Sequence, residues 1–172
     1  MKASELSVSE YPEFYRPYVE VLGDLELSSA LEDSKSSFLE LLQSINPEQL
    51  QYAYAEGKWT VAEAIIHIID TERIFQYRVL RLARNDKTEL PGFDQNVFVP
   101  TCNAQNRSLE SIIVEYKAVR ESTLSLFYSL DAQALERSST VSGGTVSARA
   151  ILYMIAGHQL HHVTILKDRY GI

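Results

Sequence analysis

Hydrophobic residues recur at steps of three and four along four long segments of the chain, which is the pattern of an amphipathic helix. We expect helices over residues 25–46, 61–84, 109–130 and 145–170. Glycine and proline, which interrupt helices, fall almost entirely between these segments. Four helices of about 20 to 25 residues predict an all-α fold in the form of a four-helix bundle.

The ends of the predicted helices carry capping residues. Thr60 and Glu63 form a capping box at the start of the second helix, and Ser108 is a capping residue before the third. Gly171 follows the fourth helix, where a left-handed residue is expected. Gly157 is the one glycine inside a predicted helix, which indicates either tight helix packing or the close approach of another backbone or a ligand.

An N-terminal arm, residues 1–24, precedes the first helix. Its segment 10–23 is rich in aromatic residues but contains two prolines, so we expect an irregular arm or a short helix that packs on the bundle. No strand-like alternation and no internal repeat competes with the helical pattern. We therefore predict one domain over residues 1–172.

Composition narrows the function. A chain of 172 residues that is 45% hydrophobic and 23% charged can bury one full core. The net charge of −7 and the scattered basic residues argue against nucleic-acid binding. The longest apolar stretch, 150–156, is too short to cross a membrane, and the N-terminus does not resemble a signal peptide. We expect a cytoplasmic protein, in which the single cysteine, Cys102, is a passive small residue.

All four histidines lie in the second and fourth predicted helices: His67, His158, His161 and His162. His158 and His162 are one turn apart on the apolar face of the fourth helix, so both imidazoles are predicted to point into the bundle. A buried histidine can be satisfied by a backbone carbonyl or a tyrosine hydroxyl. A pair on a core face, with a third histidine available, favours a metal site instead.

The height of His67 along its helix predicts the topology. If the second and fourth helices were parallel, His67 would lie about 12 Å from the level of His158 and His162, too far for metal bonds near 2 Å. If they are antiparallel, the three rings come level. This requires an up-down-down-up bundle with a long crossover between the second and third helices. Residues 85–107 are long enough to provide it.

Three neutral imidazoles with a free fourth position are typical of an open, catalytic site for a divalent ion such as Zn²⁺ or Ni²⁺. Water or a thiol could fill the free position. Asp70 lies one turn after His67 and is a candidate to orient a metal-binding imidazole by accepting a hydrogen bond from its other ring nitrogen. The alternative is a surface charge paired with Arg73 or Arg78. His161 points about 80° away from the pair and is expected to be an outer-shell or surface residue.

A second apolar face on the predicted helix 61–84 needs a cover. It consists of Ile66, Ile69, Tyr77 and Leu80. Either the aromatic arm or a second subunit could cover it, and the two prolines of the arm favour a homodimer.

Three sequence segments carry a family resemblance: GKWTVAEAIIHIIDTERIFQYRVLRLAR, LPGFDQNVF and AGHQLHH. With them the chain resembles the DinB-like superfamily, in particular its YfiT-like metalloproteins, over about residues 15–170. The resemblance implies an up-down-down-up bundle, commonly dimeric, in which His67, His158 and His162 bind a divalent metal.

The resemblance also suggests an activity. It implies a thiol S-transferase, which joins a low-molecular-weight thiol such as bacillithiol, mycothiol or glutathione to an electrophile. Other members look like thiol-dependent isomerases. A metal-dependent hydrolase, as the family was once described, is the second alternative, and a non-catalytic, stress-associated metal-binding protein is a further one. We expect the thiol transferase.

Overall fold

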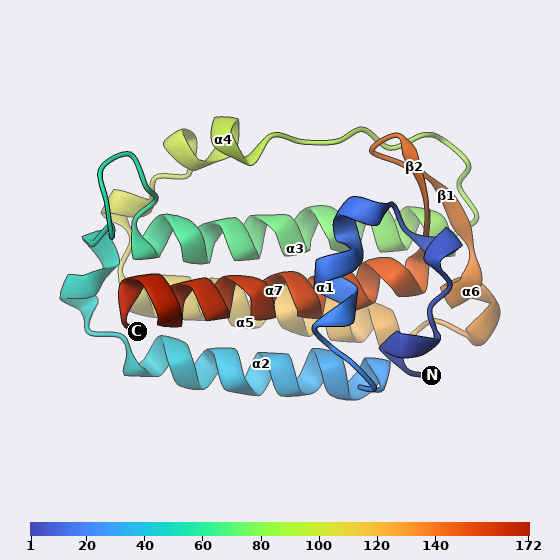
Figure 1. Cartoon of the computed structure of the whole chain (residues 1–172), viewed down its shortest axis with the longest axis horizontal. Helices are drawn as coiled ribbons and strands as arrows, with labels where there is room; N and C mark the ends of the chain where they lie inside the picture. The colour runs from blue at the N-terminus through green and yellow to red at the C-terminus, as the bar shows by residue number, and fades with distance from the viewer.

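Four long helices form the body of the computed structural model, which describes all of residues 1–172. They are α2 (Leu27–Ser44), α3 (Val61–Ala83), α5 (Leu109–Tyr128) and α7 (Ala148–Tyr170), and they lie side by side (Figure 1). The predicted four-helix bundle is confirmed, with helix bounds close to those expected from the hydrophobic pattern.

The shorter elements lie at the ends of the bundle or across it. They are the helices α1 (Arg16–Glu20), α4 (Gln95–Phe98) and α6 (Ala132–Glu136), and the strands β1 (Ser138–Val141) and β2 (Gly144–Ser147). Six short 3-10 helices complete the fold: Ala3–Glu5, Val8–Glu10, Glu13–Tyr15, Pro47–Gln51, Val99–Thr101 and Ala104–Asn106.

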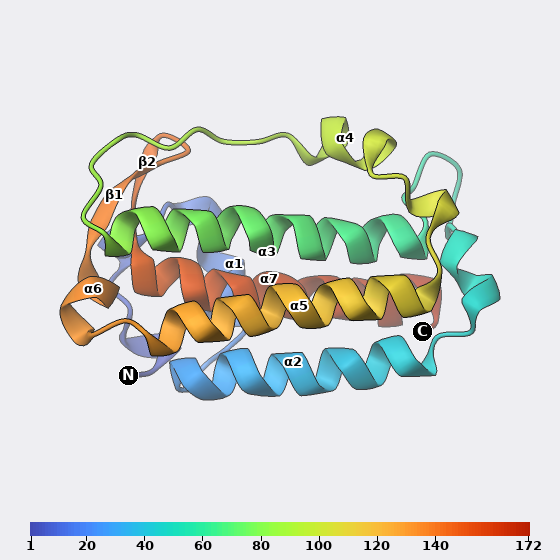
Figure 2. The same ribbon diagram turned by 180° about the vertical axis from the view of Figure 1, so that it is seen from behind.

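The helices have the up-down-down-up order that the histidine positions predicted. α2 and α7 run in one direction, and α3 and α5 run in the other (Figure 1). Because α3 and α5 are parallel, the chain returns along the whole bundle between them, as Figure 2 shows. None of the helices is long and apolar enough to cross a membrane.

The predicted caps are present in the structure. Thr60 and Glu63 form a reciprocal capping box at the start of α3, and the Ser108 hydroxyl accepts a hydrogen bond from the Ser111 amide. Gly171 follows α7 with φ +69°, in the left-handed region. These caps fix where α3 and α5 begin and where α7 ends, and hence the height of each histidine along its helix.

An antiparallel hairpin corrects two expectations, that the fold lacks strands and that the fourth helix begins near residue 145. Strand β1 pairs with β2 through a two-residue turn in which Ser142 and Gly143 have φ of +52° and +81°. Two positive φ values are typical of a type I′ turn. Strands of only four residues are too short to give a clear alternating pattern. Ser147 then caps α7 by accepting a hydrogen bond from the Ala150 amide.

The hairpin holds the long crossover in place. The Leu90 amide donates to the Thr140 carbonyl at 3.0 Å, and the Ser142 amide donates to the Leu90 carbonyl at 2.9 Å. The next residues of the crossover therefore pass close to the turn of the hairpin, on the outer side of α3 (Figure 2). Gly92 and Ser142 both line the cavity described below.

The helix α1 of the arm crosses α7 (Figure 1), and the Tyr18 backbone of the arm lies against Gly157. A Cβ atom at Gly157 would lie 1.7 Å from the Tyr18 carbonyl oxygen, so only glycine permits this contact. This settles the two alternatives for Gly157 in favour of the approach of another backbone. The arm is also anchored by Glu10, whose carboxylate accepts hydrogen bonds from Arg149 at 2.6 and 2.7 Å and from Ser147 at 2.8 Å.

The second apolar face of α3 is covered differently from what was predicted. Ile66 and Ile69 are 4% and 0% exposed, and they belong to a core cluster that includes Leu109 and Ile112 of α5. The expectation that the arm or a second subunit covers these two residues was wrong. A helix that packs against α5 as well as α7 buries a wider arc than one stripe. Only Tyr77 and Leu80 remain exposed, and the homodimer stays a prediction.

Candidate metal centre

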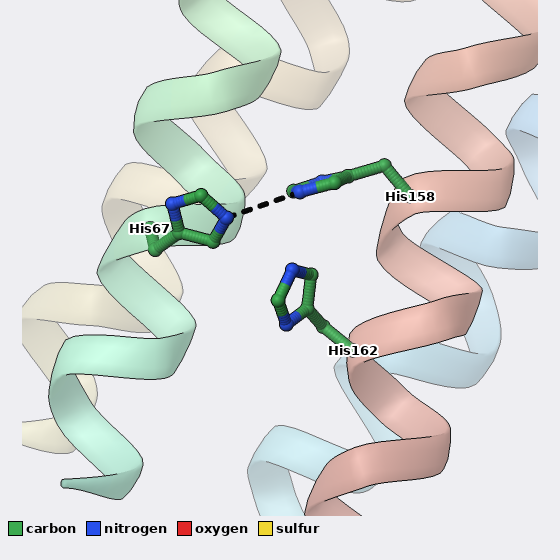
Figure 3. Close-up of side chains that lie close together, drawn as sticks. All are labelled: His67, His158 and His162. Carbon is green, nitrogen blue, oxygen red and sulfur yellow. Dashed lines mark hydrogen bonds between the residues drawn. The ribbon is translucent and has the colours of Figure 1, made fainter. Parts of the chain in front are cut away.

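Three histidines from two antiparallel helices meet beside the crossing arm. His67 comes from α3, and His158 and His162 come from successive turns of α7 (Figure 3). One ring nitrogen from each lies within 4.8 Å of the others, and the Nε2 atoms of His67 and His158 are 3.1 Å apart. The structure thus brings together the three residues that the helix geometry selected.

Aromatic rings hold the imidazoles in place. The Trp59 ring lies 4.9 Å from the His67 ring, and the Tyr18 ring meets the His158 ring edge-on at 5.4 Å, measured between centroids. Trp59 stands just before the cap of α3, and Tyr18 belongs to the arm where it crosses Gly157. The loop before α3 and the N-terminal arm therefore both contribute to the orientation of the rings.

The three imidazoles are neutral at pH 7. Burial lowers the pKa of His67 to about 4 and that of His162, which also faces other imidazoles, to about 3. Burial and the neighbouring histidines hold the pKa of His158 well below its usual value. Neutral imidazoles keep a free lone pair, which is the form that binds a metal ion.

The donor set fits a borderline divalent cation. Two ligands at about 2.0 to 2.1 Å in a tetrahedral site are separated by roughly 3.3 Å, close to the 3.1 Å between the Nε2 atoms of His67 and His158. Imidazole nitrogen suits Zn²⁺, Ni²⁺ and related ions better than it suits Mg²⁺ or Ca²⁺. Three protein ligands leave a coordination position for water or a substrate.

A cavity of about 390 Å³ opens from the histidines. Its walls are aromatic, made by Phe14, Tyr15, Tyr18, Trp59, Phe75 and Phe93. Its polar lining comes from the three histidines together with Thr71, Gln95, Ser142 and His161. The lining includes no carboxylate, lysine or arginine side chain. The cavity therefore combines aromatic walls with a polar lining of comparable extent.

Sequence reasoning missed most of this lining. The aromatic density of the arm indicated that it packs against something, but not that Tyr15 and Tyr18 line the site. The Ser-Gly-Gly run at 142–144, with β-branched residues on both sides, is a hairpin signal that could have pointed to Ser142. Nothing in the local sequence marks Thr71.

The other candidate residues lie outside the trio. Asp70 accepts a hydrogen bond from Arg73 at 3.4 Å and makes none to an imidazole, so its orienting role stays a prediction. Burial raises its pKa, against the lowering effect of Arg73. His161 is exposed at the rim of the cavity, where its ring meets Tyr18 at 5.4 Å. Cys102 is half-buried outside the cavity, and burial raises the pKa of its thiol.

Two solved structures share the fold. YfiT from Bacillus subtilis, described as "a probable metal-dependent hydrolase with an unusual four-helix bundle topology", superposes with a TM-score of 0.73 at 16% identity, covering 97% of this chain and 93% of its own. A mycothiol-dependent maleylpyruvate isomerase superposes with a TM-score of 0.66 at 15% identity, over 81% of this chain and 60% of its own. At these identities the likeness concerns the fold.

Sequence comparison gives relatives of similar length. A protein of Oceanobacillus iheyensis named "Putative metal-dependent hydrolase" is 29% identical over 130 residues, 74% of each chain. A Bacillus cereus protein of the same name is 24% identical over 161 residues, 91% of each chain. The family model of the DinB superfamily matches residues 30–166, which include all three histidines. The chain belongs to the DinB superfamily.

Proposed function

We propose that the protein is a cytoplasmic, metal-dependent enzyme that transfers a low-molecular-weight thiol to an organic electrophile. The observation that carries this proposal is the convergence of three neutral imidazoles, within 4.8 Å, at one end of a 390 Å³ aromatic cavity. The names of the relatives, which describe metal-dependent proteins, support the metal requirement.

The lining of the cavity favours a thiol over water as the nucleophile. A divalent ion bound by the histidines supplies a Lewis acid that stabilises the deprotonated form of a ligand. A free thiol has a pKa near 8.5, whereas that of bulk water is about 15.7, so a thiol needs far less assistance. The lining includes no carboxylate that could serve as a general base for water, and its one imidazole outside the trio, His161, lies exposed at the rim.

The chain's own residues bind and orient the reactants in this proposal. His67, His158 and His162 would hold the divalent ion, which would keep the thiol deprotonated, and the aromatic walls hold the electrophile within reach and exclude water. The sulfur attacks the electrophilic carbon, a C–S bond forms, and the leaving group departs with the bonding electron pair. The thiol proton passes to solvent. The volume of about 390 Å³ exceeds the roughly 30 Å³ of one water molecule more than tenfold, which leaves room for an organic acceptor.

A metal-dependent hydrolase is the second candidate. The names of the sequence relatives and the description of YfiT favour it. The mycothiol-dependent isomerase, which shares the fold, favours thiol chemistry.

One experiment separates the two. The protein is loaded with Zn²⁺ or Ni²⁺ and assayed with glutathione, bacillithiol or mycothiol and 1-chloro-2,4-dinitrobenzene, and separately with 4-nitrophenyl acetate without thiol. We expect thiol- and metal-dependent loss of chloride that disappears in His162→Ala. Ester hydrolysis without thiol turnover would replace the transferase by the hydrolase. Failure of both, with the metal bound, would leave a non-catalytic metal-binding protein.

We retain the homodimer as a proposal on a narrower basis, the exposed Tyr77 and Leu80 of α3. Sedimentation velocity at micromolar concentration tests it. A dimer that Leu80→Glu converts to a monomer supports it, and a monomeric wild-type chain rejects it.

A further inference from the structure

One face of α3 connects the histidines to a buried arginine. His67, Thr71, Phe75 and Arg78 follow one another at steps of four, four and three residues, so they share a face of the helix. The first three line the cavity. Arg78 lies beyond them, roughly 16 Å along the helix axis from His67. This face of α3 therefore leads from the three histidines toward the positive charge of Arg78.

Arg78 has no negatively charged partner in the protein. Its side chain is buried, with the residue 3% exposed, and no carboxylate oxygen lies within 4.0 Å of its guanidinium. It donates hydrogen bonds to the Pro91 carbonyl at 2.8 Å and to Ser142 Oγ at 3.2 Å, and it lies over the rings of Phe75 and Phe93. All of these groups are neutral. A buried charge without a counter-ion is costly and favours a nearby anion.

Ser142 carries the effect of this charge into the cavity. It accepts the hydrogen bond from Arg78 and itself lines the cavity. A hydroxyl whose lone pair is engaged by a guanidinium keeps its own O–H available to donate. The hairpin turn and the Leu90 carbonyl fix the Ser142 backbone, so the hydroxyl is held in position.

Thr71 offers a second unused donor. Its Oγ1 has no hydrogen-bond partner, although the residue is only 3% exposed, and it is the one such buried side-chain atom in the chain. A hydroxyl in a helix can bond to the carbonyl four residues earlier, but this one does not. A buried hydroxyl without a partner is destabilising, and a rotation of the side chain that aimed it at a ligand group in the cavity would remove this cost.

We propose that the part of the cavity between Thr71 and Ser142 is a subsite for a carboxylate, with the two hydroxyls as hydrogen-bond donors and the charge of Arg78 behind Ser142. The aromatic walls around it fit a small organic carboxylate. The carboxylate belongs either to the electrophile or to the thiol, which share this chemistry. Insofar as it names the substrate class, the inference rests on the proposed function, but binding of a carboxylate can be measured without turnover.

Trp59 provides the measurement. It is the only tryptophan of the chain, and it lines the cavity. Benzoate and benzamide have nearly the same shape but differ in charge, so a difference in their affinities reports recognition of the carboxylate. Binding is followed by Trp59 fluorescence and by calorimetry on the full chain, both metal-loaded and metal-stripped. We expect wild-type protein to bind benzoate about tenfold more tightly than benzamide in both states.

Substitutions test whether the subsite causes the preference for benzoate over benzamide. Arg78→Gln should remove the preference for benzoate and leave benzamide affinity unchanged. Arg81→Gln, on the same helix but paired with Asp86, is the matched control and should keep it. Thr71→Val should lower the preference about threefold with no loss of stability, since it removes an orphan hydroxyl. If Arg78→Gln does not fold, Thr71→Val and Ser142→Ala carry the test.

Two results would overturn the subsite. Equal affinity of wild-type protein for benzoate and benzamide is one. A preference that survives Arg78→Gln but vanishes on metal removal is the other, because it would place the carboxylate on the metal.

Turnover identifies the source of the carboxylate. The metal-loaded enzyme is assayed with 4-chloro-3-nitrobenzoate or its amide as acceptor, and with 3-mercaptopropionate or 2-mercaptoethanol as thiol. Arg78→Gln should raise KM about tenfold only for the reactant that carries the carboxylate. Absence of turnover would reject the proposed function and leave the binding result standing.

Discussion

The carboxylate of Glu72 and the guanidinium of Arg120 form a two-point ion pair at the centre of the bundle, with N–O distances of 2.7 and 2.8 Å. Arg120 is fully buried, and it also donates to the Leu31 carbonyl of α2 and to Gln159 of α7. The pair thus ties α3 and α5 to the other two long helices. Glu72 directly follows Thr71 on α3, and Gln159 directly follows His158 on α7.

Removal of one partner of this pair should destabilise the whole bundle. Glu72→Gln leaves the Arg120 charge buried with an incomplete set of partners, and we expect a loss of about 3 to 5 kcal/mol in the free energy of unfolding. Urea unfolding measures it. The matched control is Glu121→Gln, which breaks the exposed Lys35–Glu121 pair between α2 and α5 and should cost about 0 to 1 kcal/mol. Similar losses in the two variants would contradict the central role of the buried pair.

Metal content should follow the three-histidine site. We expect about one divalent ion per chain, lost in His67→Ala, His158→Ala and His162→Ala, because two imidazoles form a weaker site than three. His161→Ala is the control and should keep the ion, since this ring lies at the rim of the cavity. Elemental analysis of the purified variants decides it. Full metal content in folded His162→Ala would reject the site.

Asp70 can be tested against its partner. If Asp70 orients an imidazole in the metal-bound protein, Asp70→Asn should weaken metal affinity by about ten- to a hundredfold. If it only pairs with Arg73, then Arg73→Gln and Asp70→Asn should both leave affinity unchanged. Competition with a chromogenic chelator measures the affinity of each variant.

Substitution of Gly157 should displace the arm. Gly157→Ala places a Cβ atom against the Tyr18 carbonyl, so we expect a loss of about 1 to 3 kcal/mol and faster proteolysis within residues 1–24. Gly171→Ala introduces strain at a positive φ but meets no neighbour within 4 Å. That control should lose stability without exposing the arm to protease. An arm equally protected in Gly157→Ala and wild type would show that the crossing is looser than described.

The arm should also loosen in acid. Burial raises the pKa of Glu10, but hydrogen bonds from Arg149, Ser147 and the Ser7 backbone outweigh it and hold the pKa below its ordinary value of 4.5. A lowered folded-state pKa means that Glu10 contributes stability above pH 4.5, which is lost as pH falls through the folded-state value. Glu10→Gln should therefore be less stable than wild type at pH 7, and the difference in the free energy of unfolding should narrow as pH falls below 4.5. Urea unfolding at pH 7 and at several lower pH values checks this, and a difference that does not narrow with falling pH would contradict it.

The spacing of apolar residues predicted the features of the fold that depend on local sequence. The four long helices follow from apolar residues at steps of three and four, and the levels of His67, His158 and His162 along their helices were enough to predict the topology. The hairpin at 138–147 was missed because strands of four residues give little pattern.

Contacts between distant segments could not be predicted in this way. The burial of Ile66 and Ile69 depends on how many neighbours α3 has, which no single helix reveals. The Glu72–Arg120 pair and the cavity lining by Thr71 and Ser142 depend on side chains that meet only after the bundle forms. Such polar contacts leave no periodic signal in the sequence.

The crossover between the parallel helices α3 and α5 also bears on how the protein folds. The cavity draws on residues from Phe14 to His162, so only a fragment that spans most of the chain contains it. Contacts between residues so far apart in sequence form late and slow the folding of a helical protein. A ligand that binds in the cavity therefore recognises only the complete native state. Its binding free energy adds to the stability of the entire chain, so that ligands can be found by the rise in melting temperature even before the reaction is known.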